Sequence, residues 1–262
     1  MFPGAVADRE AAAYAILGAP LDATTTFRPG TRFGPRELRH VAQSFEDYDQ
    51  HTESCFTDLS VYDHGDIHPG DDISEYLHFL SGEVRDYHEE GVVPLLLGGE
   101  HTVTIAALRA LEPDVYVCLD AHLDLRESYA GNPLSHATVA HHALEYADEV
   151  IILGARSGTE EEWERTKRNN VTAIAPEAVA DWEPDLNGDV YLSVDIDAAD
   201  PGYAPGTGTP EPFGLNPQTM HEAVRSVAGQ SIGFDVVEVN DRDHGQAAAL
   251  GAKLLRAFVY AH

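Results

Sequence analysis

The chain has 262 residues, of which 43% are hydrophobic, so it is long enough for one large α/β domain with a buried core and short for two. Aspartate and glutamate total 45 against 16 lysines and arginines, and the formal net charge is −29. Such a surface repels nucleic acid and anionic lipid, since both bind clustered Lys and Arg side chains. We therefore expect a single domain over residues 1–262 and neither kind of partner.

The acidic residues are spread along the whole chain rather than gathered in one tail. This distribution favours adaptation to high salt, which screens their mutual repulsion, over an acidic surface reserved for one partner. No stretch of about 18 apolar residues is present, and residues 1–16 lack a basic region followed by an apolar core. Cys55 and Cys118 are too few for a disulfide framework, and the apolar run around Cys118 predicts a buried thiol. A cytoplasmic location without a membrane span is expected.

Short apolar runs alternate with helical patterns along the chain. The runs expected to form strands are residues 15–18, 92–97, 115–119, 150–153, 171–174, 190–194 and 232–237. The patterns expected to form helices are residues 104–111, 136–146, 160–168, 218–227 and 247–260. Strands that alternate with helices pair in parallel through right-handed crossovers, and continuous apolar runs suit a sheet covered on both faces. The pattern predicts a three-layer α-β-α domain around a central, mostly parallel sheet.

Residues that bind metals or carry protons follow four of these runs. GGEH (98–101) follows the second run, DAHLD (120–124) the third, DID (195–197) the sixth and Glu238 the seventh. Alone, each segment has an ordinary explanation as a turn, a helix cap or surface polarity. In an open parallel sheet, however, ligands bind beyond the carboxyl ends of the strands. The four segments are therefore expected to converge on one crevice.

The spacing within these segments indicates a metal site. Extended backbone places residues i, i+2 and i+4 on the same side of the chain. Six side chains can thus face one cavity: His101, Asp120, His122, Asp124, Asp195 and Asp197. Two ions about 3.5–4 Å apart that share carboxylates use this set better than one ion, and could hold a hydroxide ready to attack a carbon. Carboxylates and imidazoles without a thiolate favour Mn²⁺ over Mg, Fe, Co or Zn.

Beyond these residues, the sequence resembles the ureohydrolase family, which includes arginases and agmatinases. The matching motifs are GGEHT (98–102), DAHLD (120–124), SVDIDAADPGYAPGTGTPEP (193–212) and DVVEVN (235–240), with agmatinase-type segments at 18–35 and 134–139. They cover nearly the whole chain in order. The resemblance implies a three-layer α/β fold, two Mn²⁺ per subunit and a cyclic homo-oligomer, a trimer or hexamer.

Position in these motifs also implies a role for each site residue. One ion would be held by His101, Asp120, Asp124 and Asp195. The other would be held by Asp120, His122, Asp195 and Asp197, so that Asp120 and Asp195 bridge the two ions.

Two further positions carry family roles. His136 lies where the family places a proton-shuttling histidine, and Glu238 where it places the carboxylate that binds the guanidinium. The chemistry agrees, because a carboxylate matches a planar guanidinium with two hydrogen bonds and a histidine can protonate the amine leaving group.

His141 and His142 match no such role and are expected to be solvated or to lie behind the site. Residues 202–208 are expected to line the rim of the crevice.

Three positions leave questions open. The family usually has a proline where Asp241 stands, which leaves the setting of the loop around Glu238 open. Arginases have an asparagine where Arg126 stands, which speaks against arginine as the substrate. Arg126 could instead pair with a carboxylate, so it is a candidate substrate-binding residue for a guanidino acid. Arg156 could face the crevice or a subunit interface.

The resulting prediction is hydrolysis of agmatine, a small cationic guanidino substrate, to putrescine and urea. Arginine, guanidinobutyrate, formiminoglutamate and aminopropyl agmatine are alternatives within the family. A related deacetylase with one zinc is a rival outside it, disfavoured by His101 and Asp124, which provide for a second ion. A non-catalytic homologue is disfavoured because no ligand and no shuttle residue is missing. Metal content separates these hypotheses.

Overall fold

Eight parallel strands form the central sheet of the computed structural model, which describes all residues from Met1 to His262. They are β1 (Tyr14–Ala19), β4 (Val61–Asp66), β5 (Val93–Gly98), β6 (Val115–Leu119), β7 (Glu149–Leu153), β8 (Val171–Ile174), β9 (Val190–Asp195) and β10 (Ser231–Val237). Their order across the sheet is β4-β1-β5-β10-β9-β6-β7-β8, and every neighbouring pair is parallel. A separate antiparallel pair joins β2 (Tyr48–Asp49) to β3 (Ser54–Cys55).

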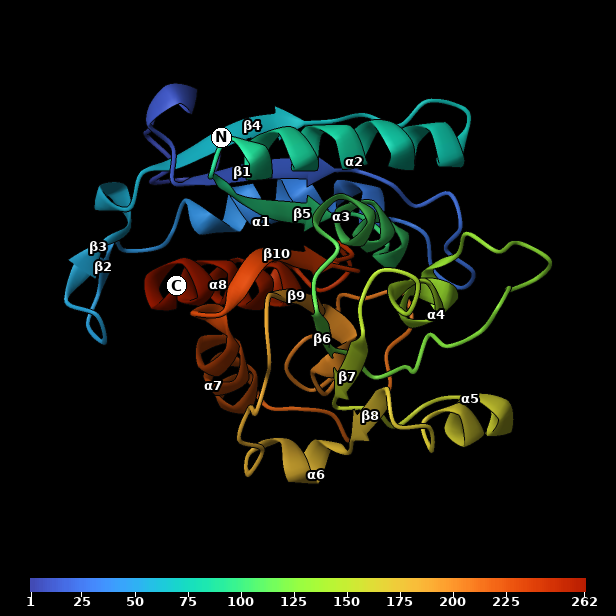
Figure 1. The fold of residues 1–262 in the computed structure, drawn as a ribbon. Coiled ribbons are helices and arrows are strands. Elements are labelled where there is room, and N and C mark those ends of the chain that lie inside the picture. The colour runs from blue at the N-terminus through green and yellow to red at the C-terminus, as the bar shows by residue number, and fades with distance from the viewer.

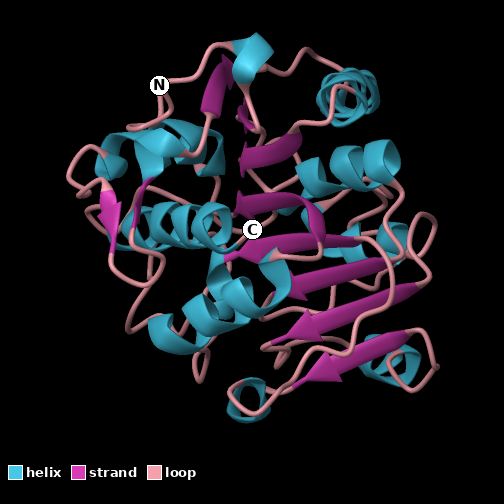
Figure 2. Ribbon diagram, turned by 60° about the vertical axis from the view of Figure 1, so that its left-hand side comes forward, coloured by secondary structure: helices cyan, strands magenta, loops and turns pink.

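Helices cover both faces of this sheet (Figures 1 and 2). The α-helices are α1 (Gly34–Ala42), α2 (Ile73–Glu89), α3 (Thr104–Leu111), α4 (Val139–Ala143), α5 (Glu160–Arg165), α6 (Pro176–Val179), α7 (Pro217–Ala228) and α8 (Gln246–Ala261). The short 3₁₀ helices are η1 (Arg9–Ala11), η2 (Thr31–Phe33), η3 (Phe56–Asp58), η4 (His101–Val103), η5 (His136–Thr138) and η6 (Ile196–Ala198).

Two apolar cores, one on each face of the sheet, define the layers. Side chains of α1, α6, α7 and α8 belong to one core, and side chains of α2, α3 and α4 belong to the other. Each strand contributes to both, because successive residues point to opposite faces. In β6, for example, Val117 packs into the first core, and Tyr116 and Cys118 pack into the second. The predicted three-layer α-β-α fold is confirmed.

The predicted strands all exist, and the central ones are the most fully buried. Every residue of β6 and β9 is buried, as continuous apolar runs require. The predicted helix over 136–146 is instead divided into η5 and α4, and the one over 160–168 ends at Arg165. β4, α1, α2 and α6 were not predicted. β4 is an edge strand with an alternating burial pattern, so its sequence VYDHGD carries no continuous apolar run.

A charged pair joins α1 to the β4 edge of the sheet. Arg39 donates from Nε and Nη2 to the two oxygens of Asp63, at 2.8 and 2.7 Å. Burial opposes the charge on Asp63, but Arg39 and the backbone amides of Gly65 and Phe2 hold its pKa below the usual range. The pair therefore stays ionised in the folded protein at neutral pH.

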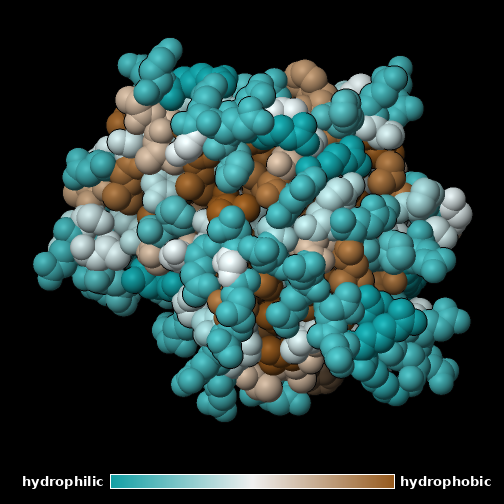
Figure 3. All heavy atoms as spheres, viewed as in Figure 1, coloured by the Kyte–Doolittle hydropathy of each residue, from teal (hydrophilic) through white to brown (hydrophobic).

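The face of the molecule shown in Figure 3 is predominantly hydrophilic. On this face, polar residues surround separate apolar patches. No helix combines the length and the apolar composition that crossing a bilayer requires.

Candidate metal centre

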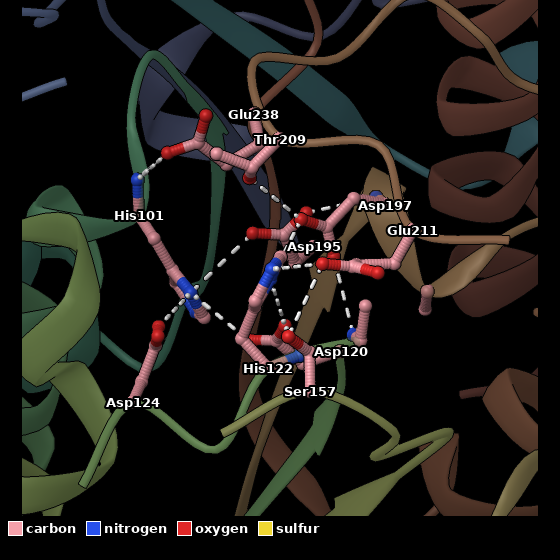
Figure 4. A network of polar contacts seen from close by, with 12 residues as sticks. His101, Asp120, His122, Asp124, Ser157, Asp195, Asp197, Thr209, Glu211 and Glu238 are labelled. Atoms are coloured by element: carbon pink, nitrogen blue, oxygen red, sulfur yellow. Dashed lines mark hydrogen bonds and ion pairs between the residues drawn. The ribbon is translucent and has the colours of Figure 1, made fainter. Parts of the chain in front are cut away.

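The carboxyl ends of β5, β10, β9 and β6, four neighbouring strands in the middle of the sheet, hold the predicted site residues. His101 begins η4 after β5, Glu238 follows β10, Asp195 ends β9, and Asp120 follows β6. All four side chains are buried. In Figure 4 His101, Asp195 and Asp120 gather around one space together with His122, Asp124 and Asp197, and Glu238 lies at its margin, turned toward the backbone of His101. The expected convergence of the four segments is thus observed.

His101 faces three of the aspartates. Its Nδ1 lies 3.1 Å from Asp124 Oδ2, 3.3 Å from Asp120 Oδ2 and 3.5 Å from Asp195 Oδ2. These are the four residues that family position assigns to one ion. Three carboxylate oxygens thus gather around one imidazole nitrogen.

His122 forms the second group with Asp197 and Asp120. Its Nδ1 lies 3.0 Å from Asp197 Oδ2 and 3.6 Å from Asp120 Oδ1. Asp120 therefore offers one oxygen to each imidazole, as a bridging carboxylate would. Asp195 supports this arrangement, since its Oδ1 accepts a hydrogen bond from the backbone amide of Asp197 at 2.8 Å.

The backbone that aims these side chains is not the extended chain that the spacing suggested. Asp124 has a φ of 48°, in the left-handed region, and Asp197 lies within η6. A strand can direct residues i and i+2 only to the same side, whereas the site needs donors that close around a point. The turn at each strand end provides that closure, so the extended interpretation was wrong although the residues converge.

The four buried aspartates of the cluster repel one another, and this repulsion favours the binding of positive charge among them. Burial, followed by the charges of Asp197 and Asp120, raises the pKa of Asp195 well above its usual range. Burial and Asp120 raise the pKa of Asp124 to about 7. Burial opposes the charge on His122, but Asp197 and Asp120 raise its pKa to about 12. A set of carboxylates and imidazoles that needs cations fits divalent metal ions.

Cys118 lies beside this cluster, with its Sγ 3.8 Å from His101 Nε2 and 3.8 Å from Asp120 Oδ2. It approaches the Nε2 side of the imidazole, away from the Nδ1 atom that faces the carboxylates. Burial raises the pKa of the Cys118 thiol to about 11, so it stays protonated at neutral pH. The prediction of a buried thiol is confirmed, and Cys118 Sγ lies close enough to His101 and Asp120 to form one group of possible metal-binding atoms with them.

A cavity of about 190 Å³ opens next to the cluster and is lined by His122, Asp124 and His136 among others. His136 Nε2 is 2.9 Å from Thr26 Oγ1. Burial, and then the positive charges of His101 and His122, lower the pKa of His136 to about 4.

Arg126 and Glu162 line the same cavity. Arg126 donates from Nε to Glu162 Oε2 at 3.1 Å, and its guanidinium carbon lies 4.7 Å from the centre of the Tyr129 ring. Glu162 is buried and also accepts from Thr159 and the Leu125 amide. The pair is therefore fixed at the cavity wall, with Arg126 as its more exposed member.

Glu238 is buried beside the cluster rather than exposed in that cavity. Its Oε1 accepts a hydrogen bond from the His101 amide at 2.9 Å, and Figure 4 places it next to Thr209. Burial, and then the charge of Glu100, raise its pKa to about 8. Asp241, which replaces the family's usual proline, is exposed, and Glu238 keeps its place at the site.

Several residues at the site were not predicted. Thr209 donates to Asp197 Oδ2 at 3.1 Å, and Glu211 Oε1 lies 3.8 Å from His122 Nε2 and accepts from Ser157 at 3.2 Å. Both follow the glycine-rich segment 202–208, and the motif GTGTPEP was the available signal. Thr26 lies in another segment that resembled the family, but nothing in its sequence distinguished it from its neighbours.

The structure shows the contacts of Arg156, His141 and His142, the residues for which the sequence indicated no definite role. Arg156 donates to backbone oxygens of Gly154, Asp197, Ala198, Ala199, Glu211 and Pro212. It therefore holds the loop that follows β9 within one subunit. His142 contacts Glu145 and the Pro133 carbonyl, and His141 lines a neighbouring cavity.

Fold and site together define a class: three-layer α/β proteins with a metal-capable carboxylate and imidazole cluster at the carboxyl edge of a parallel sheet. The chain belongs to the arginase family, whose model matches residues 12–260. The resemblance inferred from the motifs is thereby confirmed.

Individual relatives agree with this assignment. The chain is 35% identical to an agmatinase of Pyrococcus horikoshii, covering 95% of this chain and 91% of that protein. It is 37% identical to an N(1)-aminopropylagmatine ureohydrolase of Thermococcus kodakarensis, covering 94% and 89%. Among solved structures, the agmatine ureohydrolase of Thermoplasma volcanium superposes with a TM-score of 0.93 at 32% identity, covering 99% of this chain and 93% of that chain.

Proposed function

We propose that this protein is a ureohydrolase that cleaves agmatine to putrescine and urea. The observation that carries the proposal is the set of four aspartates and two histidines at the ends of β5, β9 and β6, all buried except the partly exposed His122, with Glu238 beside it at the end of β10. Relatives that are named for agmatine or an aminopropyl derivative of it, at 35% and 37% identity, support the choice of substrate.

Two Mn²⁺ ions per subunit complete the proposal. The first would be held by His101, Asp120, Asp124 and Asp195, and the second by Asp120, His122, Asp195 and Asp197. When bound, the two ions supply an activated water nucleophile at neutral pH. The family resemblance also supports a cyclic homo-oligomer, and a cytoplasmic location remains a prediction from composition.

The protein's own residues bind the substrate and move the proton. Glu238, whose orientation is fixed by the His101 amide, would accept the guanidinium, and the bound cation would keep the carboxylate ionised. His136, whose lowered pKa of about 4 keeps it neutral at pH 7, would accept a proton from the attacking water and donate it to the departing amine of putrescine. Thr26, hydrogen-bonded to His136 Nε2, would hold its ring at the cavity. The charge of Arg126 is balanced by Glu162, so the cavity stays acidic overall and suits a dication.

A guanidino acid such as guanidinobutyrate is the second candidate. Only the Nε of Arg126 has a protein hydrogen-bond partner, so its two terminal nitrogens could receive a carboxylate at the cavity wall.

The test is urea release by Mn²⁺-loaded protein in molar salt from agmatine, arginine, guanidinobutyrate and formiminoglutamate. Preference for agmatine is the expected result. Preference for a carboxylate-bearing substrate that Arg126→Ala abolishes would replace agmatine with the second candidate. Absence of urea from every compound, with two ions bound per chain, would overturn the proposed reaction.

A further inference from the structure

The two ring nitrogens of His101 have different surroundings. Nδ1 faces the carboxylates of Asp124, Asp120 and Asp195. Nε2 points away from the cavity and lies 3.3 Å from Ser193 Oγ and 3.1 Å from the Tyr116 hydroxyl. A neutral imidazole carries one proton, so whichever nitrogen holds it cannot bind a metal.

The Ser193 hydroxyl donates its only proton to a group other than His101. Its Oγ donates to Asp235 Oδ1 at 2.6 Å. Asp235 is completely buried and also accepts hydrogen bonds from Thr104 and Tyr191, both at 2.8 Å. Burial raises the pKa of Asp235, and the charge of His101 and the three hydroxyl donors oppose this rise without cancelling it. The hydrogen bond at 2.6 Å to Asp235 nevertheless uses the only proton of the Ser193 hydroxyl. The Ser193 hydroxyl can therefore only accept a hydrogen bond from His101.

The backbone fixes this geometry. Ser193 and Asp195 are two residues apart in β9, and Asp235 lies opposite Ser193 in the neighbouring β10. The same two strands thus carry a proposed ligand and the groups that act on His101. Within such a sheet, neither Ser193 nor Asp235 can turn away without disturbing the core.

We infer that Asp235, acting through Ser193, is a positioning residue that keeps the proton of His101 on Nε2 and leaves the Nδ1 lone pair free for a metal ion. The inference rests on the metal centre in the proposed function. It assigns to the buried acid of the DVVEVN motif a role distinct from that of Glu238, three residues further along. Partners of this kind typically change metal affinity by about 10–100-fold.

Asp235→Asn tests the inference because it changes the direction of one hydrogen bond. The amide introduced by this substitution can donate to Ser193, which then turns its proton toward His101 Nε2 and favours the tautomer with Nδ1 protonated. The apoprotein should bind Mn²⁺ about 10–100-fold more weakly, measured from the electron paramagnetic resonance signal of free Mn²⁺. Tyr191→Phe is the matched control, since it removes one hydrogen bond to Asp235 but keeps the Ser193 pair. Its Mn²⁺ affinity should equal that of the parent.

Ser193→Ala provides an independent measurement if the first variant does not fold. It should lower Mn²⁺ affinity by a similar factor, and adding Asp235→Asn to it should cause no further loss, because Asp235 acts through Ser193. Parent-like affinity in either single variant, or losses that multiply in the double variant, would overturn the inference. A loss in Tyr116→Phe but not in Ser193→Ala would assign the role to Tyr116 instead. A parent that binds Mn²⁺ but releases no urea would overturn the proposed reaction and leave this inference standing.

Discussion

Asp120 is the carboxylate that both imidazoles of the cluster share. Its Oδ2 lies 3.3 Å from His101 Nδ1, and its Oδ1 lies 3.6 Å from His122 Nδ1. Asp120→Asn should therefore weaken both metal sites rather than one, because an amide offers a single neutral oxygen. Mn²⁺ content after dialysis, measured by atomic emission, should fall below one ion per chain. Asp148→Asn, which changes the same charge at an exposed position, is the control, and full Mn²⁺ occupancy in Asp120→Asn would exclude the bridging role.

His136 is proposed to act on a proton and not on the metal. His136→Ala should retain its Mn²⁺ while turnover falls by roughly 10²–10⁴-fold. His142→Ala is a suitable control, since His142 contacts Glu145 and the Pro133 carbonyl. Steady-state urea release and Mn²⁺ content are measured on the same samples, so that a loss of turnover can be separated from a loss of metal. Turnover unchanged by the His136 substitution would remove this residue from the mechanism.

The residues of the site could be identified from the sequence far better than their geometry. Each candidate ligand lies within five residues after a continuous apolar run, so its place near a strand end was predictable. The left-handed backbone of Asp124 and the 3₁₀ turn at Asp197 were not, because both depend on the surrounding packing. Thr26 and Glu211 lie in loops and belong to common surface residue types, so only tertiary structure places them beside His136 and His122.

Among larger elements, the loop between β9 and α7 depends on Arg156. Five backbone oxygens of this loop, together with that of Gly154 after β7, accept hydrogen bonds from this single guanidinium. Arg156→Ala should lower the free energy of unfolding by about 2–4 kcal/mol, since several carbonyls lose a charged donor. It should also raise KM, because Thr209 and Glu211 lie in this loop. Arg168→Ala, at an exposed position, should change neither quantity. An Arg156 variant with parent-like urea denaturation and KM would contradict this assignment.

The pair between α1 and β4 gives a pH-dependent contribution to stability. The folded-state pKa of Asp63 is lowered, so its contribution is present above the unfolded value of about 3.9 and is lost as pH falls through the folded value. Asp63→Asn should cost about 3 kcal/mol at pH 7, because it leaves Arg39 without its buried partner. The difference from the parent should shrink below pH about 4. Guanidinium denaturation at both pH values is the measurement. A difference that is independent of pH would show that the charge of Asp63 is not responsible.

The elements that escaped prediction did so for different reasons. β4 has an exposed edge and polar alternate residues, so no apolar run marks it. α2, in contrast, buries Tyr76, Leu77, Leu80, Val84 and Tyr87 at helical spacing, and this periodicity was available in the sequence. α6 has only four residues, too few for a periodic signal. The central strands were predicted well because burial on both faces demands continuous apolar residues.

For the whole molecule, the net charge of −29 predicts a dependence on salt. The screening length falls from about 10 Å at 0.1 M to about 3 Å at 1 M salt, so repulsion between neighbouring acids weakens. The free energy of unfolding should therefore rise between about 0.1 M and about 2 M KCl. Urea denaturation at each salt concentration measures it, with sucrose at matched osmolality as the control for general solvent effects. Equal stabilisation by sucrose and KCl would argue against screening as the cause.

The position of β10 has a consequence for how the protein is made. This strand is the last of the sheet to be synthesised, yet it lies in the middle, between β5 and β9. Until it leaves the ribosome, the nascent chain can form only two partial sheets, one containing β4, β1 and β5 and the other containing β9, β6, β7 and β8. Each partial sheet presents an unpaired, apolar inner edge of the kind that promotes aggregation. His101 belongs to one of these halves and its partner aspartates to the other. The site proposed for the first ion is therefore absent from every shorter intermediate, whereas the residues proposed for the second ion all lie in the half that contains β9 and β6. Binding of the ion at His101 thus reports on whether synthesis and folding have been completed.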